Sequence, residues 1–167
     1  MNDLVKVETL SSKQEENLSQ SVIASFPNQY VTVVGRQWPL IPEGIYQAGY
    51  VKHDFQPAFG VPRVFVHFKI LDMGEWFETV LYRTYRLESL KNPGRKNSAF
   101  RVGRRSDFVH EMALVTNRRV DRIRPNDFEG LLLKAKVATV TEDYKQRHMP
   151  KPLQYSVIRE IIGKVDL

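Results

Sequence analysis

Apolar and polar residues alternate most regularly between Arg63 and Ile70. In an extended chain, one side of this segment carries Val64, Val66, Phe68 and Ile70. The other side carries Arg63, Phe65, His67 and Lys69. A short loop follows at Asp72-Met73-Gly74, and we expect Glu75–Leu87 to return as a long strand. The pattern predicts a β-hairpin with one apolar face and one face that mixes cations with rings.

Further strands are predicted before and after this hairpin. Ile45–Phe55 is rich in aromatic and branched residues, and proline and glycine breakers follow it. Leu131–Thr141 alternates again, with Lys134 and Lys136 on the face opposite its apolar residues, and another strand is expected from about residue 153. Shorter strands are predicted at Tyr30–Val34 and Ala99–Val102.

Apolar residues at helical spacing predict three helices. The first covers about residues 13–25, after a capping box that starts at Ser12. The second begins after Ser106, ends near Asn117, and has its apolar positions at Phe108, Val109, Met112, Ala113 and Val115. The third is expected at the end of the chain, stopped by Gly163, with Val157, Ile158, Ile161 and Ile162 as its apolar residues. A short helical turn is predicted at 126–129.

Strands outnumber helices in this prediction, and no βαβ alternation occurs. We therefore expect a mainly β protein with appended helices (α+β), built as a small Greek-key barrel of the OB type. Its strands are those from residues 45, 63, 75, 131 and about 153, with the helix at 106–117 between the third and the fourth. Residues 39–167 form the barrel domain in this prediction, with a basic loop and helix inserted at 91–126. Residues 1–38 form an N-terminal extension with a helix and a strand.

Composition narrows the classes of function. The chain has 167 residues, enough for one packed domain, and contains no cysteine, which excludes disulfide scaffolds, thiolate metal sites and cysteine nucleophiles. The longest uncharged stretch, Asn17–Gly35, is too polar to cross a membrane. The N-terminus lacks the pattern of a secretory signal, so we expect a cytoplasmic protein.

The charge is positive and unevenly distributed. Lys and Arg number 25 against 19 Asp and Glu, which gives a formal net charge of +6. Six cations and no carboxylate lie between residues 91 and 105: Lys91, Arg95, Lys96, Arg101, Arg104 and Arg105. A second group consists of Arg118, Arg119, Arg122 and Arg124. Arginine forks suit phosphate oxygens, so these clusters favour a polyanionic partner; the alternative is a solvated basic loop.

The polar face of the 63–70 strand has the composition of a single-strand nucleic-acid site. Bases stack on π faces while cations neutralise phosphates. The following strand adds Trp76, Tyr82, Arg83, Tyr85 and Arg86, although alternation prevents all of them from facing one side. The alternative is a strand buried on both faces, with Phe65 packed under a helix. The candidate nucleic-acid-binding residues are Arg63, Phe65, His67, Lys69, Trp76, Tyr82, Arg86, Arg95, Lys96, Arg101, Arg104, Arg105, Lys134 and Lys136.

Catalytic and metal-binding patterns are weak by comparison. The four histidines are scattered without a zinc-ligand spacing, and the order of residues of a nucleotide-binding phosphate loop does not occur. Asp72, Glu75 and Glu78 are the one carboxylate group that would suit magnesium at a hairpin end. We therefore expect a non-enzymatic protein without a metal or another cofactor.

Several segments resemble accessory proteins of replication and recombination encoded by phages, plasmids and integrative elements. These segments are IPEGIYQAGYVKHD, RVFVHFKILDMGEW, and LLLKAKVATVTED followed by QYSVIREII. Some proteins of that group are OB-like single-stranded DNA-binding proteins, and the resemblance implies that the Arg63–Lys69 strand and its neighbour form a binding groove. The chain departs from typical bacterial members in ending with GKVDL rather than an acidic tail, and in its long basic segment 91–126.

The sequence thus leads to three functional hypotheses. The first is a nucleic-acid-binding accessory factor, preferentially for single-stranded DNA, in replication, recombination or maintenance of a mobile element. The second is a protein-interaction module whose basic surface docks on an acidic partner in a replication or defence complex. The third is a metal-dependent nuclease. Pairing of exposed strand edges into a homo-oligomer also stays open.

Overall fold

The structure is a computed structural model that describes residues 22–26, 29–33, 39–116 and 118–165. Its strands are β1 (Val22–Phe26), β2 (Gln29–Val33), β3 (Gly44–Ala58), β4 (Val61–Ile70), β5 (Val80–Arg86), β6 (Ser89–Leu90), β7 (Phe100–Arg101), β8 (Leu132–Val140) and β9 (Tyr155–Lys164). Its helical segments are α2 (Asp107–Val115) and the short 3₁₀ turns η1 (Val120–Arg122), η2 (Pro125–Phe128) and η3 (Lys151–Leu153).

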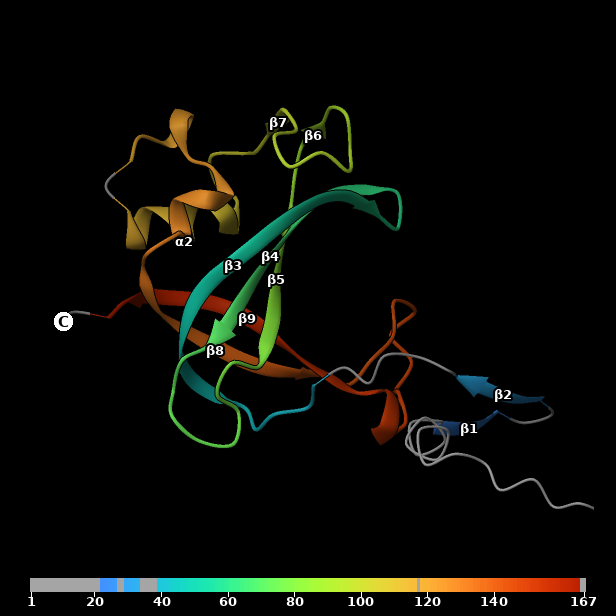
Figure 1. Cartoon of the computed structure of the whole chain (residues 1–167). Helices are drawn as coiled ribbons and strands as arrows, with labels where there is room; N and C mark the ends of the chain where they lie inside the picture. The colour runs from blue at the N-terminus through green and yellow to red at the C-terminus, as the bar shows by residue number, and fades with distance from the viewer. Residues whose placement is uncertain (1–21, 27–28, 34–38, 117, 166–167) are drawn as a thin grey trace, which may run out of the picture.

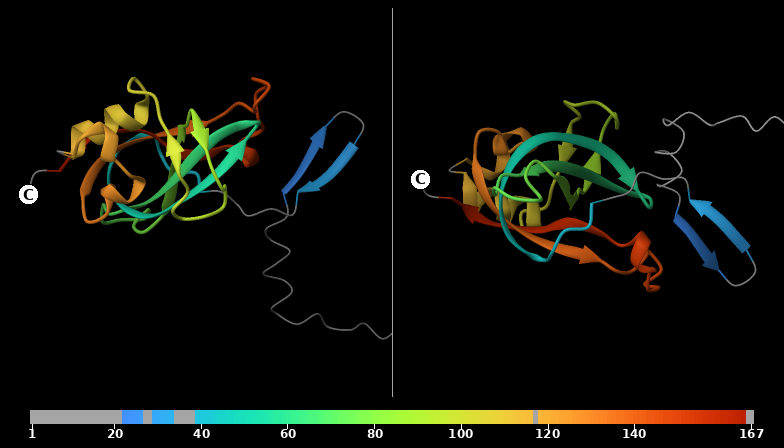
Figure 2. Two further views of the ribbon diagram at one scale, coloured as in Figure 1. Left: turned by 90° about the horizontal axis from the view of Figure 1, so that it is seen from above. Right: turned by 60° about the horizontal axis from the view of Figure 1, so that its bottom comes forward.

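Five strands form one antiparallel sheet in the order β5-β4-β3-β8-β9. The long strand β3 belongs to both halves of this sheet. Its first part, from Gly44 to Gly49, pairs with β8, and its later part, from Ala48 to Ala58, pairs with β4. A bulge between Tyr50 and Lys52 bends the strand. The sheet therefore curls around β3, as Figure 1 and the two further views in Figure 2 show.

The curl brings the two edge strands, β5 and β9, side by side. The rings of Tyr82 on β5 and Tyr155 on β9 stack with their centroids 6.5 Å apart. The strand pairing of the described residues nevertheless joins neither edge to the other. The fold is thus mostly β, as predicted, but the sheet is not a closed barrel, and the OB-type barrel that we expected from the sequence stays a prediction.

Helix α2 packs against both edge strands and is held to them by one buried carboxylate. Glu111, only 2% exposed, accepts a hydrogen bond from Arg83 Nη2 at 2.6 Å and one from the Tyr85 hydroxyl at 2.6 Å. The same carboxylate accepts the backbone N–H of Ile161 on β9 at 3.1 Å. Glu111 therefore bridges β5 and β9 through its side chain, where a closed barrel would have a backbone ladder.

The expected N-cap of this helix is confirmed. Ser106 Oγ accepts the backbone N–H of Val109 at 3.3 Å. The buried side of the helix carries Phe108, Val109, Met112 and Val115, whereas Ala113 is exposed, contrary to the prediction. The alternation of β4 is confirmed as well, because Val64, Val66, Phe68 and Ile70 are all buried in the core. The core thus lies between the inner face of the curled sheet and α2.

The predicted C-terminal helix is wrong, because residues 155–164 form strand β9. Ser156, Ile158 and Ile161 point inward, and the consecutive residues Arg159 and Glu160 are both exposed. The pairing of β9 with β8 shifts register at this point, which marks a bulge. The extra residue spaces Ile158 and Ile161 three apart, so the strand imitates a helical pattern.

Two other elements differ from the prediction. The strand expected at Glu75–Leu87 begins only at Val80, because residues before it form a turn in which Gly74 and Glu78 have positive φ angles. The N-terminal helix expected at 13–25 is wrong at its end, where Val22–Phe26 is strand β1, and its earlier part lies outside the described residues. The strand expected near residue 30 is confirmed as β2, which pairs with β1.

Candidate nucleic-acid interface

The outward face of β4 and β5 carries a regular row of paired residues. Arg63 lies opposite Arg86, Phe65 opposite Thr84, His67 opposite Tyr82 and Lys69 opposite Val80. Arg83 and Tyr85 alternate with these residues along β5, so their side chains point to the opposite face of the sheet. There they bond to Glu111 of α2. The face therefore begins with two arginines, continues with rings and ends at a lysine.

Four rings lie next to one another on this face, and we call Phe65, His67, Tyr82 and Tyr155 the aromatic row. The centroid of Tyr82 is 5.8 Å from that of Phe65, 6.3 Å from that of His67 and 6.5 Å from that of Tyr155. All four side chains are partly exposed. Phe65 is thus not a buried core residue, which removes the alternative in which it packs under a helix.

The surroundings of His67 favour its neutral imidazole over the charged form. Burial and the nearby Lys52 lower the pKa of His67, and Asp54 opposes this shift only in part. His67 Nε2 lies 3.1 Å from Asp54 Oδ2, and Lys52 Nζ lies 3.3 Å from the same oxygen. Burial is also the main cause that raises the pKa of Tyr82, followed by its hydrogen bond with Tyr155. Both rings are therefore neutral at pH 7.

The arginine end of the face holds an unused donor. Arg63 Nε is buried, and it has no hydrogen-bond partner among the described residues. The paired Arg86 is exposed. At the opposite end, Lys69 lies 3.8 Å from Glu78. The positive charge available to an anion is thus greater at the Arg63–Arg86 end.

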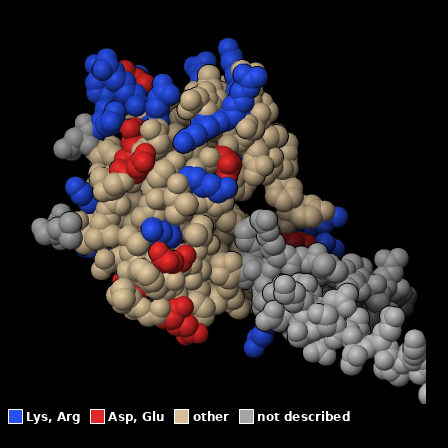
Figure 3. Space-filling view, in the orientation of Figure 1, with Lys and Arg blue, Asp and Glu red and all other residues tan. Residues whose placement is uncertain are grey.

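All six cations of the 91–105 segment are exposed, and no ion pair involves them within the described part of the chain. The segment itself is fixed. Gly94 donates its N–H to the carbonyl of Phe55 at 2.7 Å, and His53 Nε2 lies 3.0 Å from the carbonyl of Lys96. Figure 3 shows most Lys and Arg side chains of that view at the end of the molecule where β6, β7 and residues 118–124 lie.

Arg101 of the first basic group and three arginines of the second line one cleft of about 690 Å³, which we call the arginine cleft. Residues 97–102 form one wall, and residues 118 and 120–124 form the other. Its charged lining residues are Arg101, Arg118, Arg122, Arg124 and Asp121. Arg118 pairs with Asp127 at 3.2 Å, and Asp121 pairs with Arg119 at 3.2 Å. Three arginines of the lining thus have no ion-pair partner among the described residues.

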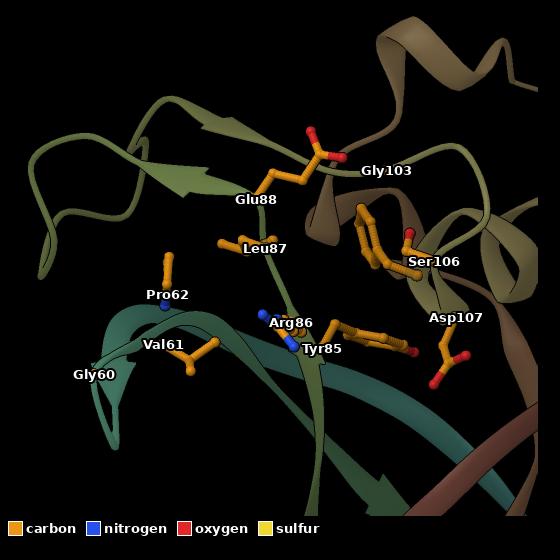
Figure 4. A pocket seen from close by; sticks show the side chains of 11 residues that line it. Gly60, Val61, Pro62, Tyr85, Arg86, Leu87, Glu88, Gly103, Ser106 and Asp107 are labelled. Atoms are coloured by element: carbon orange, nitrogen blue, oxygen red, sulfur yellow. The ribbon is translucent and has the colours of Figure 1, made fainter.

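A second cleft, of about 550 Å³, lies between the β3–β4 turn, the end of β5 and the start of α2 (Figure 4). Its charged lining residues are Arg86, Glu88 and Asp107. Because two of these are carboxylates, this cleft suits a polyanion less well than the arginine cleft does.

Three of the predicted site residues lie neither on the outward face of β4 and β5 nor in the basic 91–105 segment. Trp76 is in the turn before β5 and packs against the hydrophobic core. Lys134 and Lys136 are exposed on β8, opposite Gln47 and Ile45 of the first half of β3. Phe65 and His67 lie beside the later half of β3, and Tyr155 lies opposite Val140 at the other end of β8, so the strand pairing puts neither lysine directly beside a ring of the row.

Sequence reasoning missed two exposed rings in loops. Phe59, in the β3–β4 turn, is 78% exposed and adopts a positive φ of 52°. Tyr144, in the β8–β9 loop, is 66% exposed, and the two rings stack with centroids 5.2 Å apart. Lys145 Nζ lies 5.4 Å from the centroid of Tyr144. A bulky residue beside Gly60 in a tight turn was the available signal, because strained, exposed positions often serve function.

Two of the three carboxylates considered for magnesium have other partners. Asp72 accepts the N–H of Gln47 at 2.6 Å, and Glu78 is beside Lys69. Among the residues that the structure describes, no three acidic or histidine side chains are arranged to hold a metal ion. Nor does any described helix have both the length and the apolar character needed to span a membrane.

Comparison of the chain with protein-family models, curated proteins and solved structures gave no match. The case for a function therefore depends on the residues and their geometry.

Proposed function

We propose that the protein binds single-stranded nucleic acid on the outward face of β4 and β5, as a non-enzymatic accessory factor. The observation that carries the proposal is the aromatic row, with its partly exposed neutral rings and the Arg63–Arg86 pair at one end. Bases stack on such rings without regard to sequence, and cations at the end of the row attract the phosphates.

The topology supports this proposal. We infer that the curled sheet is a partly open barrel of the OB type: β3, β4 and β5 form a meander, α2 follows, and β8 and β9 complete the sheet beside β3. In OB folds, oligonucleotides bind on the second and third strands and on the loops after the first and fourth strands. The corresponding parts here are β4, β5, the turn at Phe59 and the loop that holds Tyr144.

Preference for single-stranded DNA, and a role in replication, recombination or mobile-element maintenance, follow from the resemblance of the sequence segments. Both belong to the proposal. Chemistry alone favours a single strand over a duplex, because stacked bases inside a duplex do not offer their faces to protein rings.

The test is a titration of labelled oligonucleotide into the protein and into the variant Phe65→Ala. Stacking on one ring contributes about 1–3 kcal/mol per base, so we expect affinity to fall about 5- to 150-fold. Phe77→Ala is the matched control, because Phe77 is an exposed ring in the turn before β5, outside the row. Equal affinity of all three proteins, or no binding at low salt, would overturn the proposal.

A second candidate function is docking of an acidic protein segment, and the unpaired arginines of the arginine cleft favour it. Arginine forks bind carboxylates as well as phosphates. An acidic partner does not require the aromatic row, however, so the effect of Phe65→Ala separates the two functions.

A further inference from the structure

The arginine cleft lies next to the arginine end of the aromatic row. Strand β5 ends at Arg86, and two residues later the N–H of Glu88 donates to the carbonyl of Arg101 at 2.8 Å. Arg101 forms part of the cleft wall. A backbone hydrogen bond thus joins the end of the proposed base-stacking face to the start of the cleft.

The side chains that line the cleft suit phosphate groups better than bases, because arginines without ion-pair partners are exposed and the one ring packs in the core. Arg101, Arg122 and Arg124 are exposed and have no ion-pair partner within the described residues. The Asp127 side chain, which is almost fully buried, pairs with Arg118 and accepts the N–H of Arg124 at 2.8 Å, so it holds the wall that carries Arg122 and Arg124. The single ring of the lining, Phe100, packs against Phe55 and Phe108 in the core.

The extent of the charge favours a long polyanion over a short acidic peptide. Besides Arg101, the 91–105 segment carries five more exposed cations and contains no carboxylate. A peptide that filled the cleft would leave these cations unused. A nucleic-acid strand that continued past Arg86 would use them.

We propose that a nucleic-acid strand bound on the aromatic row continues past Arg86 into the arginine cleft, where Arg101, Arg122 and Arg124 bind its phosphates. This inference rests on the proposed function and extends it, because it assigns a second, sequence-independent contact and a longer site. OB-type domains cover about 4–16 nucleotides. We expect the aromatic row alone to bind about 4 nucleotides, and the row together with the arginine cleft to bind about 16.

The experiment compares oligonucleotides of about 4 and about 16 nucleotides, the limits of that range. Both are titrated at several salt concentrations into the full chain and into a triple variant, Arg101→Gln, Arg122→Gln and Arg124→Gln. For the long oligonucleotide, we expect the slope of log affinity against log salt to become shallower by about 2, because each of the three lost phosphate contacts contributes about 0.7 to the slope. For the short oligonucleotide, the slope and the affinity stay unchanged.

The matched control removes the same charge elsewhere, with Lys134→Gln, Lys136→Gln and Lys164→Gln. Lys134 and Lys136 are exposed on β8 opposite the first half of β3, and Lys164 is exposed on β9 opposite Leu133 of β8. We expect the salt slope for the long oligonucleotide to stay within the error of the full chain. Thermal unfolding of both triple variants checks that each is folded. An equal effect of the two variants would show a general charge effect and overturn the inference.

The remaining outcomes separate the two proposals. If the short oligonucleotide binds and requires Phe65, but the cleft variant binds the long one like the full chain, the inference fails and the proposed function stands. If neither oligonucleotide binds at low salt, the proposed function fails, and the inference with it. If a polyglutamate peptide binds in a cleft-dependent way while the long oligonucleotide does not, the cleft is a site for an acidic protein, and the inference is overturned.

Discussion

At the scale of single residues, His67 shows how position changes chemistry. In the sequence it is one of four scattered histidines, and it belongs to a face of cations and rings. In the structure, burial and Lys52 lower its pKa, and Asp54 compensates only in part. The folded protein therefore binds a proton at His67 less readily than the unfolded chain does.

This shift predicts the pH dependence of stability. Because the pKa of His67 is lower in the folded state, its contribution to stability is complete above the unfolded value of about 6.5 and is lost as pH falls through 6.5 toward the folded pKa. We expect the variant His67→Gln to lose less free energy of unfolding than the original protein between pH 7.5 and pH 5.5. Urea unfolding at the two pH values measures this difference.

The control for this prediction is His148→Gln, at an exposed histidine of the β8–β9 loop. Its loss of stability between the two pH values should match that of the original protein. An His67→Gln variant with the original pH dependence would show that another group is responsible.

At the scale of elements, the prediction from regular alternation in β4 was correct, whereas the helix predicted over the bulged strand β9 was wrong. The alternation at 63–70 predicted β4 and its buried side correctly, because this strand has no break in its period of two. In β9, the bulge at Arg159 and Glu160 gives apolar residues a spacing that also fits a helix. The β5 prediction included a turn whose residues are aromatic and acidic rather than typical turn residues.

Contacts between distant loops had no signal in the sequence pattern. Phe59 and Tyr144 are 85 positions apart, and only the curl of the sheet brings the turn and the β8–β9 loop together. The same holds for the arginine cleft, whose two walls were visible as basic groups but not as neighbours. Composition named candidate residues, and the topology of the sheet determines which of them lie close together.

The strained loop residue Phe59 leads to a separable prediction. In Phe59→Gly, relief of the left-handed conformation offsets the lost ring stack, so we expect the free energy of unfolding to change by less than about 1 kcal/mol. Oligonucleotide affinity should fall about 5- to 150-fold if this ring stacks on a base. Denaturant unfolding and titration measure the two effects.

Met73→Ala is the control, since Met73 is an exposed apolar residue of the β4–β5 turn, a different connection. It should change neither quantity appreciably. Loss of stability in Phe59→Gly by several kcal/mol would mean that the ring has a structural role.

At the scale of the whole molecule, the sequence predicted the order of the main strands and the helix between the third and the fourth. It did not predict that the sheet stays open. The link between its edge strands β5 and β9 depends on Glu111, which in the sequence is one polar residue of an amphipathic helix. Its partners Arg83, Tyr85 and Ile161 come from two distant strands, and no local pattern connects them.

We expect Glu111→Ala to reduce the free energy of unfolding by about 3–5 kcal/mol, because it leaves the mostly buried Arg83 with only the exposed Asp107 as an ion-pair partner and the Tyr85 hydroxyl without its acceptor. Urea unfolding monitored by circular dichroism measures the change. Glu75→Ala, at an exposed carboxylate, should change stability by less than about 0.5 kcal/mol. A loss below about 1 kcal/mol in Glu111→Ala would mean that apolar packing of α2 alone holds the two edges.

The junction between β5 and β9 has a mechanical consequence. Within the described residues, its polar links are made by side chains, with Glu111 accepting from both strands and Tyr82 stacked on Tyr155. β5 and β9 can separate without breaking a series of backbone hydrogen bonds between them. Separating β3 from β4 or β8, in contrast, breaks backbone hydrogen bonds along the paired strands. When the molecule is pulled or heated, we therefore expect β5 and β9 to separate first, and the central strands β4, β3 and β8 to separate last.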